Sequence, residues 1–278
     1  MQKYEVIEAC GSGAYGMVFK AVNSATGEQV AIKKFKESDE DDIVRKTTLR
    51  EVKMLRMLRQ ENIVDLKEAF RRKRKLYLVF EYIEHTLLQV LEASPGGLPP
   101  EAVRRYIWQL VRALRWCHGH GVVHRDIKPE NLLIKPAQGG GGAPGAVGQL
   151  KLCDFGFARV LPPSPGDASI TDYVSTRWYR APELLLGSSH YSKEVDVWAV
   201  GCIMAELSDG AALFPGDSDI DQLYIVQRML GPLCRAHDIL FLKSSRFAGV
   251  KFPDMGAPET LERHFGAALP PATLSFLK

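Results

Sequence analysis

The stretch His124-Arg125-Asp126-Ile127-Lys128-Pro129-Glu130-Asn131 decides how the rest of this chain is interpreted. It lies between a predicted helix that ends near His118 and the apolar run Leu132-Leu133-Ile134, so it forms a loop between a helix and a strand. Phosphoryl transfer needs groups that orient a hydroxyl, bind a metal ion and neutralise developing charge. The octet offers carboxylate, amide and cationic side chains, which supply all three kinds, and it therefore predicts a catalytic loop.

Composition limits the class of protein. The chain has 278 residues and 46% hydrophobic content, enough for one large domain or for two lobes that share a cleft. Its apolar runs are shorter than the ~18 residues that a membrane span needs, and its first residues lead into a strand-like segment rather than a signal peptide. The net charge of +3 implies no particular partner. Five cysteines without metal-binding spacing favour free thiols, so we expect an intracellular protein.

Strand-like alternation fills the chain from Tyr4 to about Tyr82. The clearest runs cover 17–22, 29–33 and 76–80, and turn residues at 23–27 separate the first two. This pattern predicts hairpins of an antiparallel sheet.

The stretch Gly11-Ser12-Gly13-Ala14-Tyr15-Gly16-Met17-Val18 fits the pattern G-x-G-x-x-G-x-V. Glycines let the backbone approach phosphate oxygens and offer its N–H groups to them. Alone the pattern is weak, and a plain tight hairpin explains it better. A dinucleotide-binding fold needs a helix directly after the glycines, whereas 17–22 alternates as a strand. The phosphate-covering loop of a phosphotransferase therefore fits better.

Lys33 lies on the next predicted strand, in Val30-Ala31-Ile32-Lys33, where its ammonium could hold the α- and β-phosphates of a nucleotide. A solvated lysine is the alternative. Lys34 is expected to be one, because neighbours on a strand point to opposite faces.

Glu51 lies on a helix predicted over 43–59 and shares one face with Leu55 and Leu58. A glutamate on a buried face is costly unless it is paired, and Lys33 is the expected partner. The alternative is a surface charge pair with the basic residues around it.

Two charged runs flank this helix in the sequence. Glu37-Ser38-Asp39-Glu40-Asp41-Asp42 is expected to be a solvated loop rather than a partner site. Arg71-Arg72-Lys73-Arg74-Lys75 lies between two predicted strands. A charged hairpin tip is favoured there over a nuclear-import or polyanion patch, because no aromatic residues interleave with the run.

The chain changes from strands to helices near residue 84, which predicts an amino-terminal lobe over 1–83 and a carboxy-terminal lobe over 84–278. The connecting segment would act as a hinge. Backbone groups around Glu81 and Ile83 would face an adenine edge, and Phe80 would close the pocket behind it. Phe80 as an ordinary core aromatic is a compatible interpretation.

Beyond the octet, 137–148 is a low-complexity stretch and is expected to be a poorly ordered, functionally neutral loop. A strand then runs into Asp154-Phe155-Gly156, and this position gives weight to a tripeptide that alone is only a turn. Asp154 is a hard oxygen ligand suited to Mg²⁺ that bridges phosphates, and Asn131 supplies a second oxygen. Cys153 would line the floor of the nucleotide pocket, although a buried inert thiol is the default interpretation.

A Pro- and Ser-rich loop over 162–169 precedes Thr171-Asp172-Tyr173. Hydroxyls that face arginines make a phosphate switch, because guanidinium groups clamp a phosphate. Thr171 and Tyr173 are the candidate phosphorylation sites, and an unmodified polar loop is the alternative. The candidate clamp consists of Arg50, Arg125 and Arg159.

The apolar run 195–207 predicts a buried helix with Asp196 near its start. We expect the buried carboxylate to accept backbone N–H groups of the catalytic loop, which is a structural role.

Taken in order, GSGAYGMV, VAIKK, Glu51, HRDIKPEN, DFG, APE and DVWAVG resemble the motifs of eukaryotic protein kinases over nearly the whole chain. WYRAPE, FPGDSDIDQL and the Thr-x-Tyr loop resemble the branch of cyclin-dependent and mitogen-activated kinases, and LREVKML is similar to a cyclin-binding helix. KKFKES and KLCDFGFAR look most like the cyclin-dependent-kinase-like subfamily. The resemblance implies an α+β bilobal fold, with an antiparallel sheet in the first lobe and a mainly helical second lobe, and a serine/threonine kinase that uses ATP and Mg²⁺.

The same resemblance assigns roles to residues. Asp126 would accept or orient the proton of the substrate hydroxyl, and Lys128 would steady the transferring phosphate. Lys33, positioned by Glu51, would hold the other phosphates. Asn131 and Asp154 would bind magnesium. The adenine would lie among Val18, Ala31 and Leu133, with Cys10 at the rim where the family usually has an aliphatic residue.

One departure from the family concerns Glu183. In the family its counterpart pairs with an arginine on a later helix, and this chain stops at Lys278 before such a residue. We therefore expect an incomplete carboxy-terminal lobe and an unpaired buried charge at Glu183, typically destabilising by about 3–5 kcal/mol.

Two functions compete. The first is a kinase for serine and threonine hydroxyls of protein substrates, in the cytoplasm or nucleus, with a possible cyclin-like or other regulator at the helix around Glu51. The second is a catalytically silent ATP-binding scaffold. An oxidoreductase is disfavoured by the strand after the glycines. We expect no nucleic-acid or membrane partner, and the substrate and any preference for proline after the target residue stay open.

Overall fold

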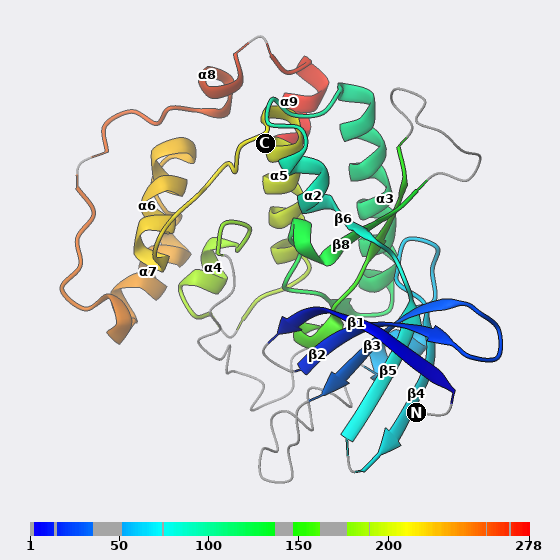
Figure 1. Cartoon of the computed structure of the whole chain (residues 1–278). Helices are drawn as coiled ribbons and strands as arrows, with labels where there is room; N and C mark the ends of the chain where they lie inside the picture. The colour runs from blue at the N-terminus through cyan, green and yellow to red at the C-terminus, as the bar shows by residue number, and fades with distance from the viewer. Residues whose placement is uncertain are drawn as a thin grey trace.

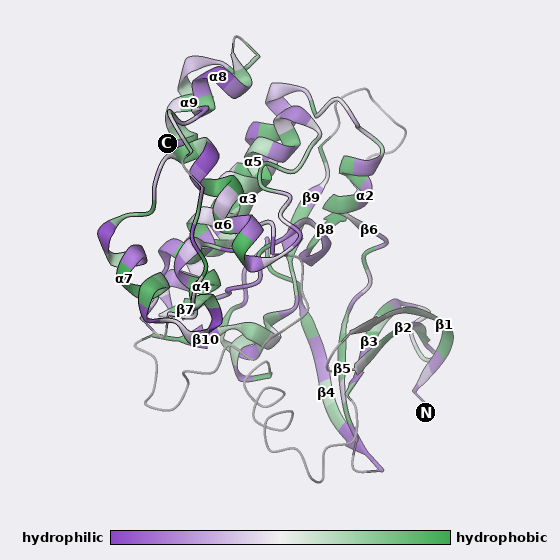
Figure 2. Ribbon diagram, turned by 90° about the vertical axis from the view of Figure 1, so that its left-hand side faces the viewer, coloured by the Kyte–Doolittle hydropathy of each residue, from purple (hydrophilic) through white to green (hydrophobic). Residues whose placement is uncertain are grey.

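A computed structural model describes residues 3–13, 16–35, 52–73, 75–136, 147–161, 177–188, 190–253, 255–266 and 268–278. Strands from the first third of the chain form one lobe, and helices from the remainder make up most of the other (Figure 1). Figure 2 shows the same division from the side. The bilobal α+β fold that the sequence predicts is thus confirmed.

The first lobe is built on an antiparallel sheet with the strand order β1-β2-β3-β5-β4. Its strands are β1 (Tyr4–Gly13), β2 (Gly16–Asn23), β3 (Gln29–Phe35), β4 (Leu66–Arg72) and β5 (Lys75–Glu81). The β2–β3 turn needs a glycine at Gly27, where φ is 71°. Along β3, Val30 and Ile32 point into a small apolar cluster, so Ala31 and Lys33 face the cavity between the lobes.

The predicted hairpin tip joins β4 to β5. Arg71, Arg72 and Lys73 are exposed there, and Arg72 lies directly opposite Lys75. The helix predicted over 43–59 is described only in part. It is helical over 52–57 and buries Met54 and Leu55.

Several predicted features lie outside the described residues. They are Arg50, Glu51, the acidic run 37–42, Arg74, the glycine-rich stretch 137–146 and the candidate phosphorylation sites Thr171 and Tyr173.

Backbone pairing between the lobes begins just before β4. Ile63 forms a parallel bridge with Leu152 on strand β9 (Gln149–Leu152). The Val64 amide donates to the Leu152 carbonyl at 2.9 Å, and the Leu152 amide donates to the Asn62 carbonyl at 2.8 Å. These bonds fix the strand that leads to Asp154 against the first lobe.

Short strands carry the loops of the site. Strands β6 (His85–Thr86), β8 (Leu132–Lys135) and β9 form one small sheet. A second pairs β7 (Val122–Val123) with β10 (Arg159–Val160). The catalytic octet therefore runs from the end of β7 to the start of β8. The two-residue strand β7, which was not predicted, lies between the octet and the helix before it.

Two long helices form the framework of the second lobe. α3 (Pro100–Gly119) starts on a proline, with Glu101 in its first turn, and turns an apolar face toward the core. α5 (Glu194–Asp209) is buried along most of its length, as the run 195–207 predicts, and ends at Gly210, where φ is 81°. The other helices are α2 (Leu87–Glu92), α4 (Pro182–Leu185), α6 (Asp219–Leu230), α7 (Arg235–Lys243), α8 (Leu261–Phe265) and α9 (Pro271–Leu277). No helix in the described part of the chain combines the length and apolarity of a membrane span.

Candidate active site

Asp196, near the start of α5, fixes the catalytic loop through hydrogen bonds to its backbone. This fully buried carboxylate accepts the backbone N–H of His124 at 2.9 Å and that of Arg125 at 2.8 Å. It also lies 2.8 Å from Nε2 of His118 on α3. The structural role expected of Asp196 is confirmed. Arg125 has a φ of 69°, a left-handed conformation that is strained for a residue with a side chain.

Asp126, Lys128 and Asn131 form a cluster immediately beyond this point. The Asn131 amide nitrogen donates to the Asp126 carbonyl at 2.8 Å and to its carboxylate Oδ2 at 2.9 Å. Lys128 Nζ lies 3.2 Å from the same Oδ2. The 3-10 turn Pro129–Asn131 brings the amide back to the aspartate. A carboxylate held by two donors has a fixed direction, which is what positioning a hydroxyl requires.

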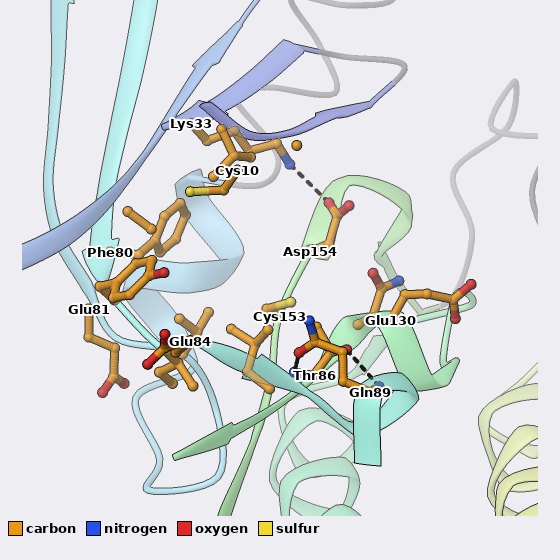
Figure 3. Close-up of a pocket in the computed structure, with 18 residues that line it drawn as sticks. Cys10, Lys33, Phe80, Glu81, Glu84, Thr86, Gln89, Glu130, Cys153 and Asp154 are labelled. Carbon is orange, nitrogen blue, oxygen red and sulfur yellow. Dashed lines mark hydrogen bonds and ion pairs between the residues drawn. The ribbon is translucent and has the colours of Figure 1, made fainter. Parts of the chain in front are cut away.

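Asp154 follows the end of β9 by two residues. Its amino-terminal neighbour Cys153 donates its backbone N–H to the Asn131 carbonyl at 3.0 Å, which ties the two loops together. Asp154 has a φ of 58° and hydrogen-bonds the Gly156 amide. Lys33 crosses from β3 and places Nζ 2.9 Å from Asp154 Oδ1 (Figure 3).

The charge of Asp154 depends on this contact. Burial alone raises the pKa of its carboxyl, but the Lys33 ammonium, with smaller help from His124 and the Gly156 amide, leaves that pKa below its ordinary value. The Asp154 side chain is still 38% exposed, so an ion can reach it. The Lys33–Asp154 pair was not predicted, because Lys33 was expected to pair with Glu51.

The cavity between the lobes has a volume of about 370 Å³. Cys10 and Lys33 approach it from the sheet, and Cys153 and Asp154 from the opposite wall (Figure 3). Predicted site residues that line it are Cys10, Gly11, Val18, Ala31, Lys33, Phe80, Glu81, Ile83, Asn131, Leu133, Cys153 and Asp154.

The rest of the glycine loop contributes less to this cavity. Gly16 and Met17 begin β2 and are not among the lining residues, and the Met17 side chain is 40% exposed. Ser12 and Gly13 form the end of β1. Ala14 and Tyr15 lie outside the described residues. The loop leads into a strand, as predicted, which disfavours a dinucleotide-binding helix.

Glu81 anchors the hinge through its side chain. Its carboxylate lies 2.6 Å from Lys151 and 3.7 Å from Lys135, both on the β8–β9 hairpin. Its backbone N–H donates to the Asp65 carbonyl at 3.2 Å. The amide of Glu81 is therefore engaged inside the protein, which favours Ile83 as the source of a backbone donor for a ligand.

Some cavity residues were not predicted. They are Val64, Tyr82, Glu84, Thr86, Gln89 and Glu130. For one pair a signal was available, because Thr86 and Gln89 have the spacing of a capping box. The Thr86 hydroxyl accepts from the Gln89 amide, and the Gln89 side chain accepts from the Thr86 amide. This start of α2 fixes one rim of the cavity.

Two arginines of the expected phosphate clamp meet at one carbonyl group. Arg125 Nε donates to the Phe157 oxygen at 2.8 Å, and Arg159 Nη1 donates to the same oxygen at 3.3 Å. A second nitrogen of Arg125 donates to the Tyr191 hydroxyl at 2.8 Å. Arg50 lies outside the described residues, so the structure brings together two members of the expected clamp.

The expectation for Glu183 is wrong. Its side chain is 22% exposed, and Oε2 lies 3.7 Å from Nε2 of His237 on α7. The carboxylate therefore reaches water and has a neighbouring imidazole, so it is not the fully buried, isolated charge that was expected.

The lining suits a nucleotide with a metal ion. Val18, Ala31 and Leu133 give apolar walls, and Lys33, Asn131 and Asp154 add polar groups. Among the described residues, no group of three or more His, Cys, Asp and Glu side chains could hold a metal by itself. Asn131 and Asp154 offer two oxygen donors, and Mg²⁺ characteristically takes its remaining ligands from phosphates and water.

Comparisons with known proteins give the family. The model of the protein kinase domain matches residues 4–244. Cyclin-dependent kinase-like 5 of Mus musculus is 54% identical over 279 residues, which include the whole chain and 28% of that protein. The motifs KKFKES and KLCDFGFAR indicate a resemblance to this fifth member of the subfamily. Cyclin-dependent kinase-like 4 of Mus musculus is 50% identical over 278 residues, covering the whole chain and 77% of that protein.

Cyclin-dependent kinase-like 2 of Homo sapiens is 50% identical over 265 residues, which cover 95% of the chain and 51% of that protein. The chain thus spans only part of each of these relatives, and little more than a quarter of cyclin-dependent kinase-like 5. The family model covers most of the chain, and one relative is matched over more than two thirds of its length. The chain therefore belongs to the protein kinase domain family and, within it, to the cyclin-dependent-kinase-like group.

Proposed function

We propose that the chain transfers the γ-phosphate of ATP to serine and threonine hydroxyls of protein substrates. The observation that carries this proposal is that an ion pair and the catalytic loop meet at one cavity. Lys33 and Asp154 are 2.9 Å apart across it, and Asn131, which also lines it, donates to Asp126 at 2.9 Å. Phosphoryl transfer needs this combination of positioning and charge neutralisation.

Each side chain has a role that its contacts support. Asp126, fixed by Asn131 and Lys128, would orient the substrate hydroxyl and accept its proton. Lys128 would neutralise charge on the transferred phosphate, and Lys33 would hold the phosphates deeper in the cavity. Mg²⁺, when bound, would neutralise the phosphate oxygens.

Asn131 and Asp154 are the residues that would hold this ion. The Asn131 amide nitrogen is used by Asp126, so its amide oxygen is the atom suited to the metal. The lowered pKa of Asp154 keeps its carboxylate ionised at neutral pH, as a magnesium ligand must be.

The test is transfer of labelled phosphate from ATP to a generic basic protein. Asp126→Asn should lower the rate by about 100-fold or more, because it removes the general base. Lys33→Arg should also lower it strongly, because a planar guanidinium does not reproduce the ammonium contact. Lys34→Arg is the matched control: Lys34 follows Lys33 in β3 but does not line the cavity, so its rate should stay close to that of the wild type.

A nucleotide-binding measurement separates this proposal from a silent scaffold. A kinase should lose transfer in Asp126→Asn and still bind ATP, because Asp126 is not among the residues that line the cavity. If the wild type binds ATP and transfers no phosphate to any of a broad set of peptides, the scaffold explains the protein instead.

Regulation and location are further parts of the proposal. Phosphorylation of Thr171 or Tyr173 would bring an anion to the clamp, and the meeting of Arg125 and Arg159 at the Phe157 carbonyl supports this. A cyclin-like or other regulatory protein would bind around Glu51. The five cysteines are free thiols, which supports a reducing location in the cytoplasm or nucleus.

A further inference from the structure

Tyr191 lies in the loop that precedes α5 and contacts the catalytic loop in two ways. Its hydroxyl accepts a hydrogen bond from Arg125 Nη1 at 2.8 Å. Its ring lies under the same guanidinium, with the Arg125 Cζ 5.1 Å from the ring centroid. A hydrogen bond and a cation–π contact to one side chain restrict its position more than either contact alone.

Tyr191 is itself held in place. Its ring packs against an apolar cluster that includes Val123, at the end of β7, and Val195, on the first turn of α5. Both anchors are fully or almost fully buried. Tyr191 therefore connects the rigid base of the helical lobe to the residue that precedes Asp126.

Arg125 passes this constraint to the opposite side of the site. Its Nε donates to the carbonyl of Phe157, which closes the 3-10 turn Phe155–Phe157 directly after Asp154. The backbone of Arg125 has a strained φ of 69° and depends on Asp196 to hold it. The guanidinium thus spans from Tyr191 to the turn that follows the metal-binding aspartate.

We propose that Tyr191 is a positioning residue for phosphoryl transfer: it fixes the Arg125 side chain, and through it the alignment of Asp126 with the Asp154 turn. This inference rests on the proposed function. A neutral hydroxyl suits the task, because it accepts a hydrogen bond from the guanidinium without cancelling its charge. Arg125 then keeps its positive charge for an incoming phosphate.

The chain contains a matched control for this contact. On α6, Arg228 Nη1 donates to the Tyr224 hydroxyl at 3.3 Å, and the Arg228 Cζ lies 6.0 Å from the Tyr224 ring centroid. The chemistry is the same, but neither residue lines the cavity. Tyr224→Phe therefore measures what removal of a tyrosine hydroxyl from an arginine does away from the site.

The first experiment compares the steady-state kinetics of Tyr191→Phe, Tyr191→Leu and Tyr224→Phe on one peptide substrate. Tyr191→Phe removes the hydrogen bond and keeps the ring, so kcat should fall by about 3- to 10-fold with the KM for ATP within about twofold. Tyr191→Leu removes both contacts and should lower kcat further. Tyr224→Phe should leave kcat unchanged. An unchanged kcat in Tyr191→Phe, or an equal fall in Tyr224→Phe, overturns the inference.

The second experiment does not depend on catalysis. Hydrogen–deuterium exchange at the amides of 122–131 should be faster in Tyr191→Phe than in the wild type, and unchanged in Tyr224→Phe. If the wild type transfers no phosphate at all, the proposed function fails while this exchange measurement still decides the role of Tyr191. If the exchange rates of these amides are the same in Tyr191→Phe and in the wild type, the positioning role is overturned.

Discussion

Asp196 holds the backbone of Arg125 in a conformation that an arginine does not adopt readily. Its Oδ1 accepts the Arg125 N–H at 2.8 Å, while Oδ2 accepts the His124 N–H and lies 2.8 Å from His118. The φ of 69° at Arg125 costs about 1–3 kcal/mol, and these bonds to a buried carboxylate offset it. A framework helix thereby fixes the residue directly before Asp126.

Asp196→Asn should destabilise the protein and slow phosphate transfer. The asparagine side chain has one acceptor oxygen, and its NH2 group would face a backbone N–H of the loop. One buried backbone N–H therefore loses its hydrogen-bond acceptor. We expect the free energy of unfolding to fall by about 2–4 kcal/mol in a urea titration. The matched control is Asp209→Asn, because the Asp209 side chain is 48% exposed and 3.8 Å from His264. That variant should change the free energy by under about 0.5 kcal/mol. Equal losses would contradict the structural role of Asp196.

Lys33→Met should change the pH dependence of stability. In the wild type the pKa of Asp154 is lower in the folded protein than in the unfolded chain. The ionised carboxylate therefore stabilises the fold at a pH above the unfolded pKa. This stabilisation is lost as the pH falls through the folded pKa. Without Lys33, burial acts with less opposition and raises the pKa of Asp154. The variant should therefore lose stability relative to the wild type as the pH rises through the range in which this carboxyl ionises.

The measurement is the free energy of unfolding from about pH 3.5 to pH 7, taken as the difference between Lys33→Met and Lys34→Met. The second variant removes a neighbouring lysine that does not line the cavity. Parallel curves for the two variants would show that Lys33 does not control the ionisation of Asp154.

Tyr179→Phe should lower the free energy of unfolding, because it removes the hydrogen bond to a buried carboxylate. The Tyr179 hydroxyl donates to Glu206 Oε2 at 2.6 Å, and both side chains are buried. Burial raises the pKa of Glu206, and the tyrosine hydroxyl opposes this. Because the pKa of Glu206 is higher in the folded protein than in the unfolded chain, stability falls as the pH rises above the unfolded pKa. Removal of the Tyr179 hydroxyl should raise the folded pKa of Glu206 further. The loss should be about 1–3 kcal/mol at about pH 8 and smaller at about pH 5.

The control for this prediction is Tyr4→Phe. Tyr4 also donates to a glutamate at 2.6 Å, but the Glu68 side chain is 34% exposed and is paired with Lys3. Its pKa is lowered, mainly by Lys3. The loss in Tyr4→Phe should therefore be similar at about pH 5 and about pH 8. A Tyr179→Phe loss that does not depend on pH would contradict a buried, ionised Glu206.

What the sequence predicts well here depends on short-range spacing. The alternation over 17–22 and 29–33 predicts β2 and β3, and the buried run 195–207 predicts α5. The octet predicts the Asp126–Asn131 cluster, because a loop of a few residues leaves these side chains little choice of neighbour. The role of Asp196 follows in the same way from a carboxylate inside an apolar helix.

Long-range contacts were harder to predict. Lys33 and Asp154 are separated by 121 positions. The motifs predict that both residues serve the same phosphates, but not that they form an ion pair with each other. The positive φ values at Arg125 and Asp154 are imposed by tertiary contacts on residues that do not favour them. A single tyrosine such as Tyr191 belongs to no pattern, so its contact with Arg125 is evident only in the folded structure.

The last prediction concerns Glu183, where the sequence-based expectation was wrong. An unpaired buried carboxylate would cost about 3–5 kcal/mol, and its replacement by glutamine would recover much of that. The side chain is instead 22% exposed and 3.7 Å from His237. We therefore expect Glu183→Gln and His237→Gln each to change the free energy of unfolding by less than about 1 kcal/mol in urea titrations. Because salt screens the interactions of a carboxylate that reaches water, the change in Glu183→Gln should shrink between about 0.1 M and 1 M sodium chloride. A gain of several kcal/mol in Glu183→Gln would restore the original expectation, and a large loss in His237→Gln would show that the imidazole does more than neighbour a hydrated carboxylate.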